Sequence, residues 1–515
     1  MQKITRRNSL QCTALAGGAL ALAGCERSIS LATRRLGQDI PGEVFVAESD
    51  DIDDIHHLLN RAAYGPWPGD ISRVKSIGGS AWLDEQLRPE SINDLACELR
   101  ARRFESVFVK PGNAYEFKES VLREELSRHT LLRAIYSRKQ LFEVMVGFWT
   151  DHLNIDLGKG DCIYFKPWDD LHVVRKHALG NFRDLIGASA KSPAMLVYLD
   201  GKENRKRKGT DDIPNENYAR ELMELHTMGV HGGYTQKDVT EAARCLTGWT
   251  IRPKKAFLDR GMVYFKPSHH DEGEKTILGK TIPPRKGKDG AADLDDLIDV
   301  LCRHPSTADY ISTKLCRRFV GYQPPETLVA RVAADFTESK GDIKTVLRTI
   351  LSSDEFSQSK GQRFKRPFRY IVSTLRALGA DTQAHKPLIE YINRLGQPLF
   401  SYPTPDGYPE DKMPWMGTLL WRWNFAFGAV NHEIPDVRIR LKKLGAAIGA
   451  PDEGTVAPEK MVAYLLGREA TKNEMAAIAD YQKQMKKAEK KADGQSKQRD
   501  ELLAVLLASP AFQRC

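Results

Sequence analysis

The sequence predicts a mainly α-helical protein: a large multi-helix domain with short irregular or β insertions. Two stretches support this prediction. Residues 120–153 repeat apolar side chains at helical spacing, and residues 215–250 have the pattern of two helices joined by a glycine turn. Hydrophobic residues make up 41% of the chain and charged residues 28%, which is ordinary for a soluble globular protein.

Residues 1–25 have the features of an export signal. Arg6 and Arg7 lie in the string TRRNSL, which resembles a twin-arginine signal. The segment ends in LAGC, which resembles a lipobox whose cysteine, Cys25, receives a diacylglycerol. We therefore expect a lipoprotein of the cell envelope, anchored to the membrane through Cys25 and facing the periplasm. Glu26 after the cysteine favours the outer membrane. Ordinary cleavage, giving a soluble periplasmic or secreted protein, is the alternative.

The charge of the chain is mildly basic. The formal net charge is +9, and three of the positive charges belong to the export signal. This excess indicates solubility, with some attraction to anionic envelope polymers or lipid headgroups. We expect no nucleic-acid partner, because an exported chain without interleaved basic and aromatic residues is a poor match to such a protein.

The mature chain divides into three parts. We expect a polar tether at residues 26–50, an N-terminal helical part at 51–358 that contains the central polar motif, and a C-terminal helical part at 359–515. The two helical parts also fit a single unit. The first helix of the folded part has His56 and His57 in its opening turns, where we expect them to be core or surface residues.

A histidine ends the apolar face of the helix predicted before residue 153. Five side chains follow one another along this face at helical spacing: Phe142, Met145, Phe148, Trp149 and His152. One interpretation of His152 is a buried histidine that donates to a backbone carbonyl. The other is a metal ligand or general base, because polar residues follow it directly.

Residues 215–250 form the central motif. We expect its first helix over about residues 215–228, ending at Gly229. The second helix starts at Thr235, and Asp238 has the spacing of a capping box with that threonine. Apolar residues then recur at helical spacing until Gly248.

The first helix of the central motif has a polar face that includes Glu221 and Glu224. Such a face is either solvated or the lining of a pocket. Glu216, Arg220 and Glu224 lie four residues apart, which matches a salt-bridge ladder that contributes a few tenths of a kcal/mol per pair. Oxygen ligands with histidines nearby favour a divalent ion instead. No recognised short metal signature is present.

A basic loop, residues 201–214, precedes the central motif. Its basic residues are Lys202, Arg205, Lys206, Arg207 and Lys208, which come before Asp211 and Asp212. Charge runs of this kind are usually solvated. The position next to the central motif leaves a second interpretation, a lid or a guide for anions.

Several strings resemble one bacterial family. In chain order they are HLLNRAAYGP, FWTDHLN, NENYAREL, EAARCLTGW, HDEGEKTILG, LGQPLF and LLASPAFQ. On these motifs the sequence is identified as a member of the family catalogued as domain of unknown function 1800, over everything after about residue 50. The resemblance implies an exported, mostly helical protein, often encoded beside a second exported family. It implies no reaction. Tyr408 stands where the family usually has tryptophan.

The resemblance also selects a second histidine. Of the adjacent His269 and His270, the family pattern favours His270, the one followed by aspartate. His152, Glu221, Glu224 and His270 are then the predicted ligand set for one divalent metal ion, provided that the fold brings them together.

Two functions follow from these features. The first is metal-assisted hydrolysis or group transfer on an envelope or extracellular polymer. His152 or His270 would act there as base or ligand. Glu221 and Glu224 would be ligands or the general acid and base, and Arg220 would hold an anion or the transition state. The alternative is a non-catalytic binding or assembly protein that works with an exported partner protein, with the central motif as a buried ion-pair network.

Overall fold

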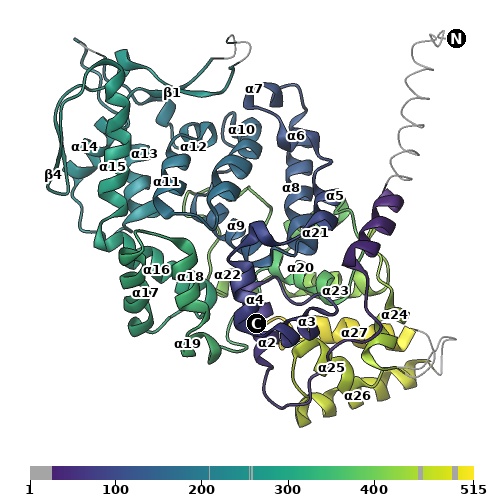
Figure 1. Ribbon diagram of the computed structural model, residues 1–515. Helices are drawn as coiled ribbons and strands as arrows, with labels where there is room; N and C mark the ends of the chain where they lie inside the picture. Colours follow the sequence, from purple (N-terminus) through teal and green to yellow (C-terminus); the bar gives the residue numbers. More distant parts are fainter. Residues whose placement is uncertain (1–25, 208, 254–255, 257–258, 451–455, 490–496) are drawn as a thin grey trace, which may run out of the picture.

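The computed structural model describes residues 26–207, 209–253, 256, 259–450, 456–489 and 497–515. These residues form a mainly helical protein with two antiparallel pairs of short strands, shown in Figure 1. The predicted fold class is confirmed. The predicted export signal and Cys25 lie outside the described residues. Among the residues that are described, no helix is both long and apolar enough to cross a membrane.

The segment expected to be a tether begins as a helix. Residues 26–33 are helical and run into η1 (Arg34–Gln38). Arg34 forms an ion pair with Asp381 at 2.8 Å, and Thr33 accepts a hydrogen bond from Arg100. Residues 26–38 of the predicted polar tether are therefore helical in the structure. Polar contacts attach the segment to the body, and apolar periodicity gives no sign of such contacts.

Helix α8 (Glu119–Tyr136) is central to the first third of the chain. Helices α5, α6, α10 and α20 all pack against it. The region before the central motif contains α2 (Asp54–Ala62), α3 (Asp70–Ile77), α4 (Gly79–Gln86), η2 (Pro89–Ser91), α5 (Leu95–Ala101), α6 (Glu105–Phe108), α7 (Pro111–Ala114), α9 (Gln140–His152), α10 (Cys162–Asp169), η3 (Asp170–Arg175), α11 (Phe182–Ala190), α12 (Pro193–Tyr198) and η4 (Gly201–Glu203). The apolar face predicted for α9 is buried, as Phe148 and Trp149 show.

The central motif forms the predicted pair of helices. α13 (Asn217–Glu221) continues without a break as η5 (Leu222–Thr227), which has π-helical winding, and α14 is Gln236–Cys245. Gly229 ends the first helix with φ of +80°, and a Cβ there would lie 2.8 Å from the ring of Tyr310. Both hydrogen bonds of the capping box between Thr235 and Asp238 are present.

Two hairpins follow the central motif. β1 (Trp249–Ile251) pairs with β2 (Val263–Phe265), and β3 (Lys275–Ile277) pairs with β4 (Lys280–Ile282). Strand β3 packs against α14. The segment from this region to α19 contains η6 (Pro267–His269), η7 (Gly287–Ala291), α15 (Ala292–Cys302), α16 (Pro305–Phe319), α17 (Glu326–Glu338), α18 (Ile343–Leu351) and α19 (Asp354–Ser357).

The C-terminal helices return to the beginning of the described chain. They are α20 (Pro367–Ala377), α21 (Lys386–Arg394), α22 (Met413–Met416), α23 (Leu419–Val430), α24 (Leu441–Ile448), α25 (Pro458–Leu466), α26 (Lys472–Glu489) and α27 (Lys497–Ala508). Figure 1 shows α25 and α27 beside α2 and α3, and the N–H of Asp53 donates to the carbonyl of Gly467 at 2.8 Å. One hydrophobic core is continuous through both predicted helical parts.

Candidate functional site

The predicted site residues fall into two clusters. Glu221 and Glu224 lie on the helix formed by α13 and η5. His152 ends α9 and contacts that helix through the backbone carbonyl of His226, 3.0 Å from its Nε2. His270 lies in a different cluster with Asp293. The fold therefore brings three of the four predicted ligands to one region and places the fourth elsewhere.

The predicted four-ligand metal shell is not assembled. In the described part of the chain, the group of three acidic or histidine side chains that places its ligand atoms within 4.8 Å of one another is Glu26, His385 and Asp436. Protein donors already engage that group. Arg103 donates to Glu26 at 3.2 Å, and the backbone N–H of Gln383 donates to Asp436 at 2.8 Å.

His270 belongs to a sealed ion-pair network. Its Nε2 lies 3.2 Å from Asp293, and its Nδ1 lies 3.0 Å from the carbonyl oxygen of Thr247. Lys275 and Arg285 also contact Asp293, at 2.5 and 2.7 Å. The side chains of His270, Lys275 and Asp293 are fully buried. Burial alone would raise the pKa of Asp293, but these three hydrogen-bond partners lower it to about 2.

His152 contacts a lysine instead of a carboxylate. Its Nε2–H donates to the carbonyl of His226, so its Nδ1 is the acceptor for Lys314, whose Nζ lies 2.9 Å away. Burial lowers the pKa of His152 well below its ordinary value, and the charge of Lys314 lowers it further. His152 is therefore a neutral imidazole with both ring nitrogens engaged.

Lys314 lies on α16 and has an unusually low pKa for a lysine. Burial lowers its pKa from 10.5 to about 8, although the carboxylates of Asp151, Glu410 and Asp406 oppose the shift. A lysine of this pKa is partly neutral near pH 8. Its free amine is then competent to accept a proton or to attack an electrophile.

Glu221 has a carboxylate without a partner. Among the described residues, no hydrogen bond or ion pair reaches it. Burial raises the pKa of Glu221, and the charges of Glu224 and Asp406 add to this shift. Glu224 is different, because it lies 3.5 Å from Arg220 and accepts a hydrogen bond from Tyr234. Both carboxylates are partly exposed and accessible from solvent.

Arg220 forms the salt-bridge ladder that its spacing predicts. Its guanidinium lies 3.3 Å from Glu216 and 3.5 Å from Glu224, and it donates to Gln236 at 2.9 Å. Its donors are thus largely occupied by the protein, which leaves little capacity for the predicted role as a clamp.

A proline-rich loop, residues 402–409, completes the polar cluster. Asn154 donates to two carbonyls of this loop, at 2.9 and 2.8 Å. Gly407, with φ of +74°, lies so close to α9 that a Cβ would overlap the carbonyl of Asp151. The charge of Asp406 affects the pKa of both Lys314 and Glu221, so one carboxylate is within electrostatic reach of both. We call Lys314, His152, Glu221, Glu224 and Asp406 the Lys314 cluster.

Sequence reasoning missed two members of this cluster. Lys314 lies on α16 among apolar residues, and Asp406 lies in the loop, more than 150 residues from the central motif. Nothing in a single sequence joins these segments. The sequence could have indicated His226, because this histidine lies in the central motif itself. Its Nε2 is buried and has no hydrogen-bond partner among the described residues.

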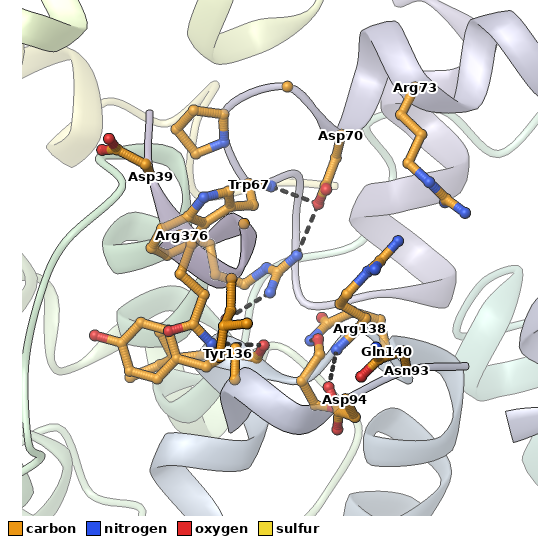
Figure 2. Close-up of a pocket in the computed structure, with 18 of the residues that line it drawn as sticks. Asp39, Trp67, Asp70, Arg73, Asn93, Asp94, Tyr136, Arg138, Gln140 and Arg376 are labelled. Atoms are coloured by element: carbon orange, nitrogen blue, oxygen red, sulfur yellow. Dashed lines mark hydrogen bonds and ion pairs between the residues drawn. The ribbon is translucent and has the colours of Figure 1, made fainter. Parts of the chain in front are cut away.

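A separate cavity lies away from the Lys314 cluster, and Figure 2 shows it. Its volume is about 490 Å³, which is sufficient for a small organic ligand. Figure 2 shows Trp67 on one side, the ion pair of Asp70 with Arg376 in the middle, and Asp94 with Arg138 on the other side. No predicted site residue lines this cavity.

Fold and site together define a mainly helical protein with a polar cluster suited to acid–base chemistry. The chain belongs to the family described as protein of unknown function (DUF1800), whose model matches residues 57–514. This confirms the resemblance read from the motifs. Comparison with curated proteins and with solved structures finds no match.

Proposed function

We propose that the protein is an exported lipoprotein of the cell envelope that catalyses hydrolysis or group transfer on an envelope or extracellular polymer. The observation that supports this most directly is Glu221, a partly exposed carboxylate with a raised pKa and no hydrogen-bond or ion-pair partner in the described part of the chain. Carboxylates that only form structural ion pairs usually have depressed pKa values, whereas catalytic acids have raised ones.

The roles of the other groups follow from their positions. Protonated Glu221 would give its proton to a leaving group, and ionised Glu221 would take one from an attacking water. Lys314 would stabilise developing negative charge when protonated, or act as a base when neutral. His152 orients Lys314 through its Nδ1. Glu224 favours the protonated form of Glu221 by like-charge repulsion.

Of the four predicted metal ligands, only Glu221 and Glu224 are proposed to bind a metal ion. Both ring nitrogens of His152 are engaged, and His270 lies in the sealed network. Glu221 has free oxygen atoms, and carboxylate oxygens suit magnesium, calcium or manganese. Elemental analysis of the purified protein beside Glu221→Gln tests this point. One metal per chain that is lost in the variant supports the ion; equal content in both proteins removes it from the mechanism.

The test of catalysis compares two glutamates of the same helix region. Isolated envelope polymer fractions are incubated with the wild type, Glu221→Gln or Glu216→Gln, and released fragments are measured by mass spectrometry. We expect release by the wild type and by Glu216→Gln, because the carboxylate of Glu216 is already engaged by Arg220, Gln236 and Thr240. We expect at least a hundredfold less release by Glu221→Gln. An equally active Glu221→Gln variant would refute the proposal.

A non-catalytic binding protein that works with an exported partner is the second candidate. The cavity of Figure 2 favours it, because its volume of about 490 Å³ is sufficient for a ligand and no residue of the Lys314 cluster lines it. Co-purification of the full chain with the neighbouring exported protein, unaffected by Glu221→Gln, would support this candidate over catalysis.

A further inference from the structure

We propose that a basic cleft beside the β1–β2 hairpin binds a small organic phosphate or sulfate. The cleft has a volume of about 290 Å³, and its cationic lining consists of Lys202, Arg205, Arg252 and Arg260. It shares no lining residue with the Lys314 cluster or with the cavity of Figure 2. The proposal therefore does not depend on the proposed function.

The structure divides the basic loop of residues 201–214 into two sets of side chains. Arg207 forms an ion pair with Asp212 at 2.8 Å, and Lys206 donates to the carbonyl of the same aspartate at 2.7 Å. Both cations therefore have their partners within the loop itself. Lys202 and Arg205 instead line the cleft, where they meet cations from the hairpin.

Positive charge exceeds negative charge in the cleft. Arg205 and Arg260 form no ion pair among the described residues, and Nε of Arg260 is buried without a hydrogen-bond partner. Of the two acidic residues in the lining, Glu203 lies 3.9 Å from Lys202, and Asp161 accepts a hydrogen bond from the Tyr115 hydroxyl. Two guanidinium groups are therefore left for an anion.

The positive charges around the cleft also lower the pKa of a histidine in its lining, His269. Burial lowers the pKa of His269, and the charges of Lys266, Arg205 and Arg207 lower it further. Cations that disfavour a protonated imidazole also attract an anion to this place.

The backbone between Lys202 and Arg205 and the side chain of Arg260 are held in place before a ligand arrives. Asn204, between Lys202 and Arg205, is buried; it donates to the carbonyl of Ala243 at 2.8 Å and accepts from the N–H of Asn215 at 2.9 Å. The guanidinium of Arg260 stacks 3.6 Å above the Tyr115 ring. Such preorganisation reduces the entropy lost on binding.

The shape and charge of the cleft indicate the class of ligand. Guanidinium groups bind the oxygens of phosphate or sulfate in a bidentate manner. The cleft is larger than a bare phosphate ion, so it leaves space for the organic group that bears the phosphate. A small phosphorylated or sulfated sugar fits this description.

The test uses glucose 6-phosphate as the probe and glucose as its neutral control. Binding to the full chain is measured by titration calorimetry at constant ionic strength, so that screening does not differ between the ligands. We expect glucose 6-phosphate to bind and glucose not to bind. Arg205→Gln and Arg260→Gln should each raise the dissociation constant on the order of tenfold. Arg207→Gln, the same change on a neighbouring arginine that is already paired, should change it less than about twofold.

Two results would overturn the proposal. Absence of glucose 6-phosphate binding would do so, even if phosphatidylglycerol vesicles bind, since the cleft would then serve a lipid surface. Equal weakening by Arg205→Gln and Arg207→Gln would also do so, because it would reveal a general charge effect instead of a built cleft.

Discussion

The two histidine clusters that the sequence joined into one site differ in how their charges are matched. In the His270 cluster, Asp293 is surrounded by His270, Lys275 and Arg285, and the interior side chains are inaccessible to solvent. In the Lys314 cluster, a cation faces the neutral imidazole of His152. Nearby, the carboxylate of Glu221 has no hydrogen-bond or ion-pair partner among the residues that the structure describes.

This difference separates a structural role from a chemical one. Matched, sealed charges stabilise the fold only while every partner is present. Unmatched charges at an accessible position cost stability and are retained where they perform chemistry. The comparison therefore supports a structural role for His270 and the proposed chemical role of Glu221 and Lys314, and the following substitutions test this interpretation.

Asp293→Asn should have the largest effect on stability. The substitution leaves Lys275 as a buried cation with no opposing charge, so we expect a loss of about 3–5 kcal/mol in the free energy of unfolding. Urea unfolding at pH 7 measures it. Asp296→Asn is the matched control, because Asp296 also pairs with Arg285 but its side chain is 41% exposed, whereas that of Asp293 is fully buried. A loss as small as that of the control would show that the network is not structural.

The pH dependence of the wild type should follow the same network. The pKa of Asp293 is lowered to about 2 in the folded protein from an ordinary value of 3.8. The folded state therefore binds fewer protons than the unfolded state in this range, and stability is lost as pH falls from about 4 towards 2. Asp293→Asn should lack this contribution in acid unfolding followed by circular dichroism. An unchanged acid transition would contradict the assignment.

Lys314→Met tests the other cluster through pH. Because the pKa of Lys314 is lowered from 10.5 to about 8, the unfolded state binds more protons between these values. Lys314 should then contribute a rise in stability between pH 8 and pH 10, so the rise should be smaller in Lys314→Met than in the wild type. Burial also lowers the pKa of Lys365 to about 7, and that lysine remains in the variant. Urea unfolding at both pH values measures it. Lys442→Met, at an exposed lysine, should retain the rise.

The sequence predicted local structure better than the site. The capping box at Thr235 and the helix end at Gly229 depend on neighbouring residues, so they were predictable from local patterns. The site depends on contacts between distant segments. Lys314 reaches His152 from α16, and Asp406 comes from a loop in the C-terminal half. Helical spacing places residues on one face of one helix and does not identify its partner.

The separation of His270 from the other predicted ligands has the same cause. A histidine followed by aspartate is compatible with a metal ligand or with an ion-pair network. The buried ion pairs of Asp293 with His270 and Lys275 show that His270 belongs to an ion-pair network. Neither partner lies next to His270 in the sequence.

Glu221→Gln should have little effect on stability, in contrast to Asp293→Asn. A raised carboxyl pKa means that ionised Glu221 costs stability at pH 7, and removing the charge relieves this cost. We expect the free energy of unfolding to stay equal or to rise by less than about 1 kcal/mol, since solvent screens a half-exposed group. A strong decrease in melting temperature would instead support the buried network of the binding interpretation.

Of these substitutions, Arg220→Gln should have the smallest effect on stability. Arg220 contacts Glu216 and Glu224 at 3.3 and 3.5 Å on a partly exposed face, so the ladder contributes only a few tenths of a kcal/mol per pair. The opposing influence of Arg220 on the pKa of Glu221 also disappears, so that pKa should rise. A shift of the acidic limb of the activity profile to higher pH, with unfolding almost unchanged, would connect the ladder to Glu221. An unshifted profile with lost activity would assign Arg220 a direct role in substrate binding instead.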